Sequence, residues 1–176
     1  ADLKGKSVSI GAPGSGVYFN AVDVLEAAGL TEKDIKPQYQ SFADSADALK
    51  DGKIDAAFIV AGPPTPAITE LWTTNSAYLV PIDGEVADAL MAACPFYTTY
   101  AIPAGTYNGQ TEDVTTVTVK ATLIVSASAS EEDVYKITAA IFDNIDEYRD
   151  SNTERGRKLR EYISRELGFE SIEFQS

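Results

Sequence analysis

Two short segments of this sequence combine glycine, proline and small side chains in a way that suits anion binding. The first is Gly-Ala-Pro-Gly-Ser-Gly-Val at residues 11–17, and the second is Ala-Gly-Pro-Pro-Thr at residues 61–65. Each follows an apolar run and precedes a segment with helical spacing of apolar residues. The first-turn N–H groups of a helix have no partner within it, and the helix dipole places partial positive charge there. Two such turns facing one another can hold a carboxylate without a lysine, an arginine or a catalytic group.

The first segment does not match either of two familiar phosphate-binding motifs. A P-loop needs Gly-Lys-Ser/Thr at the start of the helix, whereas valine and tyrosine follow Gly16 here. A dinucleotide fingerprint needs a third small residue, and in the register of Gly14 and Gly16 that position is phenylalanine. A carboxylate fits better, with Ser15 as the helix N-cap. A plain turn before a capped helix remains an alternative, and a loop stiffened by prolines is the alternative for 61–65.

Other reactive side chains are weaker candidates. Four acidic residues at short spacing favour a solvated helix face over a metal site: Asp44, Asp47, Asp51 and Asp55. Three tyrosines either contact a ligand or, more commonly, pack in the interior or at an interface: Tyr97, Tyr100 and Tyr107. Cys94 lies in an apolar helical run and is expected to be a small buried hydrophobe. Histidine is absent, so we predict no catalytic residue, no metal site and no cofactor.

Strands and helices alternate through the first half of the chain, which is typical of an α/β fold with a mostly parallel sheet. The expected strands are 7–12, 38–42, 54–60 and 77–82, and the third is apolar enough for burial on both faces. The expected helices are 15–28, 44–50, 65–74 and 84–94. In the first of them Phe19, Val22, Leu25 and Ala28 recur at helical spacing, and Gly29 is expected to end it in the left-handed conformation. After residue 95 we expect extended segments at 96–103 and 114–126, then helices at 131–149 and 153–167. Both candidate segments follow strand ends, where ligands bind in open α/β sheets.

Composition and charge limit the partners of the chain. Its 176 residues suit one domain or two small lobes, and its net charge is -13 with a pI near 4.3. This acidity argues against nucleic acid and against an anionic membrane surface. No apolar run approaches the roughly 18 residues of a membrane span, so we do not expect the chain itself to cross a membrane. The sequence shows no signal peptide.

Five segments, in order, resemble the TAXI-type solute-binding proteins of TRAP transporters. They are LKGKSVSIGAPGSG at 3–16, SFADSADALKDGKIDAAFIVAGPPT at 41–65, LVPIDGEVADAL at 79–90, IPAGTYNGQTEDVTTVTVKATLIVS at 102–126 and DVYKITAAIFDNIDEYR at 133–149. The resemblance implies a periplasmic-binding-protein-like (type II) α/β lobe at 1–100, with a mostly parallel sheet flanked by helices. It further implies that 101–176 form a hinge or return segment, with long strands and two C-terminal helices.

The resemblance also implies a function. These proteins are periplasmic, or extracytoplasmic, receptors that capture a small organic anion such as glutamate, glutamine or another carboxylate. They deliver it to a TRAP membrane permease that an ion gradient drives. The ligand-binding residues implied for this chain are Gly14, Ser15, Gly16 and Val17 in the first segment, and Ala61, Gly62 and Pro63 in the second.

Several departures from the family pattern shape these expectations. Val17 replaces a threonine hydroxyl, and Pro63 stands where a polar residue is common. The family has a first lobe before the equivalent of Leu3, and this sequence does not include it. A single lobe would expose half of the binding cleft. The tail after Asn152 also differs from the usual ending. We therefore expect weak affinity, and we expect 114–126 to pair within this lobe or with another chain. Two alternative functions are a nucleotide-dependent α/β enzyme, which lacks an evident acid/base pair here, and a ligand-sensing regulatory domain.

Overall fold

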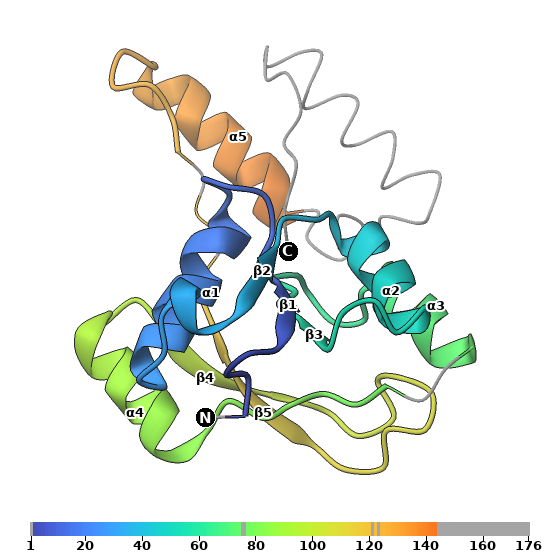
Figure 1. Ribbon diagram of the computed structural model, residues 1–176. Coiled ribbons are helices and arrows are strands. Elements are labelled where there is room, and N and C mark those ends of the chain that lie inside the picture. The colour runs from blue at the N-terminus through green and yellow to red at the C-terminus, as the bar shows by residue number, and fades with distance from the viewer. Residues whose placement is uncertain (1, 75–76, 121, 123, 144–176) are drawn as a thin grey trace. The chain divides into compact units, whose positions relative to one another are not determined.

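The computed structural model describes residues 2–74, 77–120, 122 and 124–143. They fall into two units, one that runs to residue 120 and one that begins at residue 121. The first unit holds a parallel sheet, an antiparallel hairpin and the helices around them (Figure 1). In the second unit, helix α5 is described. The division into a lobe at 1–100 and a hinge segment at 101–176 stays a prediction.

Three short strands form the parallel sheet: β1 (Ser7–Ser9), β2 (Lys36–Gln38) and β3 (Ala56–Ala57). Their order is β2-β1-β3, so β1 is the central strand. Val8 of β1 lies beside Pro37 on one side and Ala56 on the other. Proline lacks a backbone N–H and is tolerated at a sheet edge, which is where β2 lies. Helices flank the sheet, so the predicted α/β fold is confirmed.

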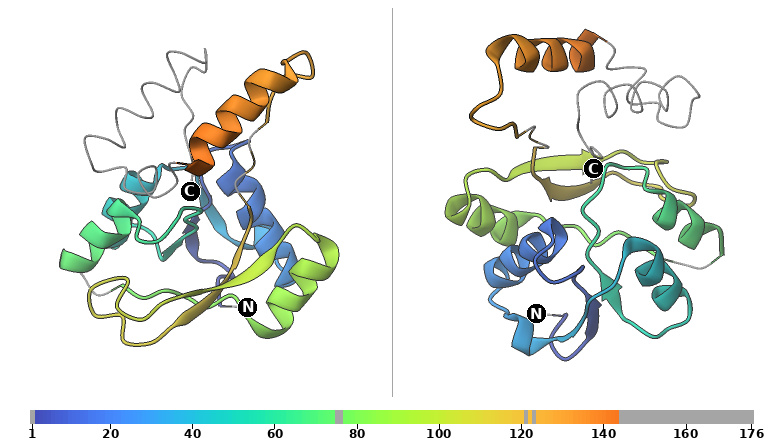
Figure 2. Two further views of the ribbon diagram at one scale, coloured as in Figure 1. Left: turned by 180° about the vertical axis from the view of Figure 1, so that it is seen from behind. Right: turned by 90° about the horizontal axis from the view of Figure 1, so that it is seen from above.

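Helices α1 (Gly16–Ala27) and α2 (Phe42–Lys50) lie on opposite sides of this sheet (Figures 1 and 2). Helix α1 connects the central strand to β2, and α2 leads from β2 back across the sheet to β3. The two connections run in opposite directions along the sheet. Because parallel crossovers are right-handed, opposite directions place their helices on opposite faces.

Both ends of α1 are set by residues next to the helix, a serine cap at the start and a glycine after the end. The N–H of Tyr18 donates to the Ser15 hydroxyl over 3.2 Å, which confirms Ser15 as the N-cap. At the other end Gly29 has a φ of 72°, which confirms a left-handed residue after the helix. A short 3-10 turn, η1 (Glu32–Asp34), then leads into β2.

The hydrophobic core of the first unit lies between β1 and α1. Its buried residues are Val8, Ile10, Ala21, Leu25, Leu30 and Ile35. Along α1 the buried face consists of Val17, Ala21 and Leu25, which are four residues apart. The spacing that begins at Phe19 does not mark the buried face, because the Phe19 side chain is 57% exposed.

The strands are shorter than the sequence predicts. The segments 7–12, 38–42 and 54–60 reduce to the bounds of β1, β2 and β3, and 77–82 forms no strand. Burial of 54–60 on both faces is wrong, since residues 56–60 are half-buried and β3 is at an edge of the sheet. An apolar strand is buried on both faces only where other elements cover both faces of the sheet at that strand.

Two further helices and a hairpin complete the first unit. The helices are α3 (Pro66–Thr74) and α4 (Gly84–Ala93). The hairpin pairs β4 (Thr98–Ile102) with β5 (Val114–Thr118) in antiparallel register. The predicted extended segments 96–103 and 114–126 are therefore longer than the observed strands. Pairing of the second segment within the lobe, one of the two expected outcomes, is confirmed.

Tyr97, directly before β4, ties this later part of the chain to α1. Its hydroxyl accepts a hydrogen bond from the Asn20 side-chain amide over 2.6 Å and donates to the Asp23 carboxylate over 2.8 Å. Burial, followed by the bond to Asp23, raises the pKa of Tyr97. The side chain is buried and both of its hydrogen-bonding functions are used, so it packs the unit together.

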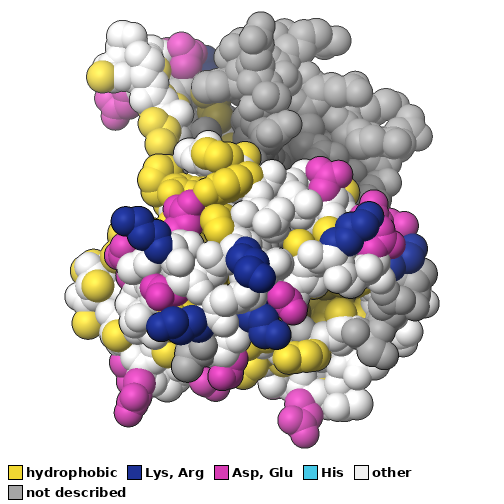
Figure 3. All heavy atoms as spheres, viewed as in Figure 1, with side chains coloured by type: hydrophobic (Ala, Val, Ile, Leu, Met, Phe, Trp, Pro, Cys, Tyr) yellow, Lys and Arg dark blue, Asp and Glu magenta, His cyan; other side chains and the backbone are white. Residues whose placement is uncertain are grey.

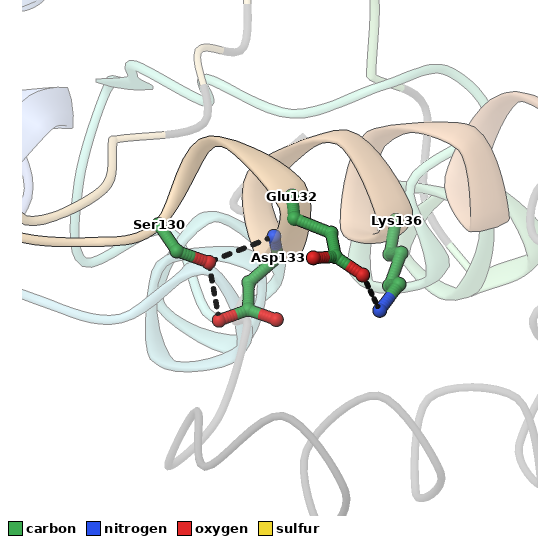
Figure 4. Close-up of polar contacts among 4 residues, drawn as sticks. All are labelled: Ser130, Glu132, Asp133 and Lys136. Atoms are coloured by element: carbon green, nitrogen blue, oxygen red, sulfur yellow. Dashed lines mark hydrogen bonds and ion pairs between the residues drawn. The ribbon is translucent and has the colours of Figure 1, made fainter.

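In the second unit, α5 (Glu131–Asp143) begins at a serine cap (Figure 4). The Ser130 hydroxyl donates to the Asp133 carboxylate over 2.6 Å and accepts from the Asp133 N–H over 3.1 Å. Glu132, also in the first turn, forms an ion pair of 2.6 Å with Lys136 of the next turn. The rest of the predicted helix 131–149 and the predicted helix 153–167 lie outside the described residues.

Charged side chains of both signs are interspersed over the face that Figure 3 shows. Lys4 pairs with Asp34 over 3.8 Å, and Lys6 pairs with Asp55 over 3.6 Å. These pairs are exposed and contribute little stability. No helix in the described part of the chain is long and apolar enough to cross a membrane.

Candidate functional site

The two candidate segments follow the carboxyl ends of two neighbouring parallel strands, so both begin on the same side of the sheet. The segment 11–17 follows β1, and 61–65 follows β3, which pairs with β1 in parallel. The N–H of Phe58 donates to the Ser9 carbonyl over 2.8 Å. This bond continues the pairing of β1 and β3 toward the carboxyl ends of the two strands. From the central strand the chain first moves to β2 and later to β3 on the opposite side. This reversal is the topological switch point at which open α/β sheets bind ligands.

The turn at residues 11–14 depends on two glycines. Gly11 has a φ of +77° and Gly14 a φ of +80°, conformations that side chains rarely adopt. Gly11 is also buried, and a Cβ added there would lie 2.8 Å from the Cβ of Val17. Gly11 therefore lets the first turn of α1 pack directly against the end of β1.

The first turn of α1 presents unpaired backbone donors at this edge. The Ser15 hydroxyl satisfies the N–H of Tyr18, while the N–H groups of Gly16 and Val17 donate to no other described residue. Gly16 is exposed and Ser15 is half-buried. Val17 as a whole residue is 4% exposed, so its side chain is not available to a ligand.

The second segment is organised around Thr65, which is buried. The peptide bond between Pro63 and Pro64 is cis, and the Thr65 hydroxyl donates to the Gly62 carbonyl over 3.2 Å. Ala61 and Pro63 are half-buried, and Gly62 is exposed. The N–H of Thr65 donates over 2.9 Å to another side chain. Proline at the next position has no N–H, so the start of α3 offers fewer free donors than the start of α1.

The partner of Thr65 is Tyr107, in the loop of the β4–β5 hairpin. The Tyr107 hydroxyl accepts this bond, and its ring stacks on Trp72 of α3 with the ring centres 4.9 Å apart. Tyr107 is 3% exposed. Of the three tyrosines singled out from the sequence, Tyr97 and Tyr107 therefore pack, whereas Tyr100 is 43% exposed on β4.

A carboxylate with two phenol donors links α1 to η1, the turn that precedes β2. The Tyr18 hydroxyl donates to Glu32 over 2.7 Å, and the Tyr39 hydroxyl donates to its other carboxylate oxygen. The Tyr39 bond, and then the Tyr18 bond, lower the pKa of Glu32. Both phenols in turn have a raised pKa, chiefly through the bond to Glu32. The cluster joins α1, η1 and the residue after β2.

Glu32→Gln is expected to lose thermal stability at neutral pH but not in acid. Because the folded-state pKa of Glu32 is lowered, its contribution is present above the ordinary carboxyl pKa and is lost as the pH falls through the folded value. Glutamine resembles the protonated carboxyl, so the two melting temperatures should converge as the pH falls through the lowered folded-state pKa of Glu32. Melting curves from pH 3 to 7 check this, with Glu26→Gln as the control. A constant gap across that range would contradict the assignment.

Three of the four acidic candidates have side-chain partners within the described part of the chain. Asp44 accepts a bond from Ser41, Asp51 pairs with Lys53 over 2.7 Å, and Asp55 accepts the N–H of Ser7 over 2.8 Å. Within the described ranges no group of three or more acidic or cysteine side chains could hold a metal ion. Cys94 is half-buried just after α4, more open than the buried position expected.

A model of the NMT1-like family matches residues 1–165. The chain belongs to the NMT1-like family. Among solved structures, this NMT1-like chain is similar to the periplasmic aliphatic sulphonate binding protein SsuA from Escherichia coli, at 19% sequence identity and a TM-score of 0.47. The match covers 95% of this chain and 45% of that one, so the NMT1-like chain spans less than half of that protein's length.

Proposed function

We propose that this NMT1-like chain is part of a solute receptor that binds a small carboxylate or amino acid, such as glutamate, without chemical change. The observation that carries the proposal is that the N–H groups of Gly16 and Val17, at the switch point of the sheet, donate to no other described residue. Backbone donors at a helix N-terminus stabilise an anion with no basic side chain. The receptor is proposed to act outside the cytoplasm.

The finer proposal is a TAXI-type receptor that hands its solute to a TRAP membrane permease. Its support is the resemblance of the quoted segments, above all the two that form the candidate site. In this proposal Gly14, Ser15 and Gly16 line one side of the solute with the Val17 N–H. The second segment, with Ala61, Gly62 and Pro63, forms the neighbouring wall. Native mass spectrometry of the gene product that contains this chain, isolated under mild conditions, should show a retained small carboxylate or amino acid.

Gly16→Pro is expected to weaken L-glutamate binding about tenfold, because it removes one of the two free donors. Proline suits the first position of a helix. The extended backbone of Ser15, with φ -75° and ψ 160°, also suits a residue before proline. The fold should therefore persist while the N–H is lost. Isothermal titration calorimetry measures the dissociation constant.

The matched control is Gly16→Ala. An added Cβ there meets nothing within 4 Å, and alanine keeps the N–H, so binding should stay as in the wild type. Equal affinities of the proline and alanine variants would contradict the role of this N–H. A wild-type protein that binds no carboxylate and retains none on isolation would contradict the receptor function itself.

A further inference from the structure

The loop between β4 and β5 carries an Asn-Gly pair in an exposed turn. Asn108 and Gly109 are both exposed, and among the asparagines of the sequence Asn108 is the one that precedes a glycine. The N–H of Gln110 donates to the Tyr107 carbonyl over 3.1 Å, which closes a turn around the pair. Gly109 has a φ of +81°, a conformation that glycine adopts in turns without strain.

Hydrogen bonds anchor the residues on both sides of this pair. The Gln110 side-chain amide donates to the carbonyls of Ile102 and Glu112 over 3.2 Å and 3.0 Å. Its oxygen accepts the Tyr107 N–H over 3.3 Å, so two bonds join Gln110 to Tyr107. The Tyr107 hydroxyl in turn accepts the N–H of Thr65 over 2.9 Å. The turn therefore connects to the second candidate segment through a single buried tyrosine.

The polar groups of the pair itself are free. The Asn108 side-chain amide and the Gly109 N–H form no hydrogen bond with any described residue. Glycine has no Cβ to shield its nitrogen from the side chain of the residue before it. Asn20 is the contrasting case, because its amide donates to the Tyr97 hydroxyl over 2.6 Å and it lies inside α1, before an alanine.

We propose that Asn108 is a site of spontaneous modification that converts it to aspartate or isoaspartate. The Gly109 nitrogen attacks Cγ of Asn108 and forms a new C–N bond. The bond from Cγ to Nδ2 breaks, and ammonia leaves with the proton of the Gly109 N–H, which produces a cyclic imide. Water then opens the imide at either carbonyl carbon. Opening at Cγ leaves aspartate, and opening at the main-chain carbon leaves isoaspartate, whose backbone runs through the former side chain.

The isoaspartate product changes the turn in two ways. It adds a negative charge, and it lengthens the backbone between Tyr107 and Gln110 by one carbon atom. The two bonds between these residues close the turn at its present length, so the longer backbone should break them. Tyr107 then loses the support that holds its hydroxyl against the Thr65 N–H. Modification is therefore expected to release the loop from the segment 61–65.

Peptide mapping by mass spectrometry tests the site in the gene product that contains this chain. The protein is incubated at mildly alkaline pH, which favours attack by the backbone nitrogen. Asn108 should convert at least about tenfold faster than Asn20, which must first break a hydrogen bond. Asn108→Gln should show no conversion at this position, because its longer side chain would have to form a larger ring. Conversion of Asn108 no faster than that of Asn20 would overturn the proposal.

Thermal melting tests the connection to Thr65. Protein enriched in isoaspartate should melt about 2–4 °C below fresh protein, since a buried donor loses its partner. Asn108→Asp adds the charge without the extra atom, so it should melt with the fresh wild type. In Tyr107→Phe, which lacks the bond already, incubation should lower the melting temperature less. An unchanged melting temperature of the converted protein, or an equal fall in incubated Asn108→Gln, would overturn this connection.

Discussion

Replacing Gly11 with alanine is expected to lower the free energy of unfolding by about 2–4 kcal/mol. The φ of +77° at this residue costs an alanine about 1–2 kcal/mol. The new methyl group would also lie 2.8 Å from the Cβ of Val17, and overpacking of this kind costs about 1–3 kcal/mol. The reduced freedom of the unfolded chain offsets only about 0.4–1 kcal/mol of this.

Gly14→Ala is the matched control for this substitution. Gly14 has a similar φ of +80°, but an added Cβ there meets nothing within 4 Å. Only the backbone term remains, so the loss should be about 1 kcal/mol. Urea unfolding followed by the fluorescence of Trp72, the one tryptophan of the sequence, measures both variants. Equal losses would show that the contact between Gly11 and Val17 does not matter.

Tyr107→Phe is expected to lower the free energy of unfolding by about 1–3 kcal/mol. The Tyr107 hydroxyl accepts the Thr65 N–H over 2.9 Å, and both residues are buried. Phenylalanine would leave this N–H without a partner, and an unpaired buried donor costs its full desolvation. The aromatic ring would still stack on Trp72, so the substitution isolates the hydroxyl.

The control for Tyr107 is Tyr100→Phe on β4. The Tyr100 side chain is 43% exposed and forms no hydrogen bond with another described residue. Substitutions at such positions usually change stability by less than about 0.5 kcal/mol. The same urea titrations compare the two variants. If both lose the same stability, the bond to Thr65 does not anchor the hairpin loop.

The features that the sequence predicts well are those fixed by a few adjacent residues. Ser15 as N-cap and Gly29 as the left-handed residue after α1 both follow from short-range backbone chemistry. The parallel sheet follows from the alternation of strands and helices. The location of 11–17 and 61–65 beyond neighbouring strand ends follows from the same alternation, because parallel strands end at a common edge.

The features that escape the sequence depend on residues far apart in the chain. Thr65 and Tyr107 are 42 positions apart, and no local pattern pairs them. The Val17 side chain packs against Gly11 and is buried, which its place among the predicted site residues did not reveal.

The bonds of Tyr97 to α1 bear on the order in which the first unit folds. The contacts with Asp23 and Asn20 span 74 and 77 positions of the chain. Closing a loop of that length costs about 4 kcal/mol of chain entropy, whereas α1 and its neighbours in the core lie within a few tens of residues. Non-local contacts of this kind slow folding. During synthesis, α1 must therefore wait without these partners until the chain has grown past residue 97.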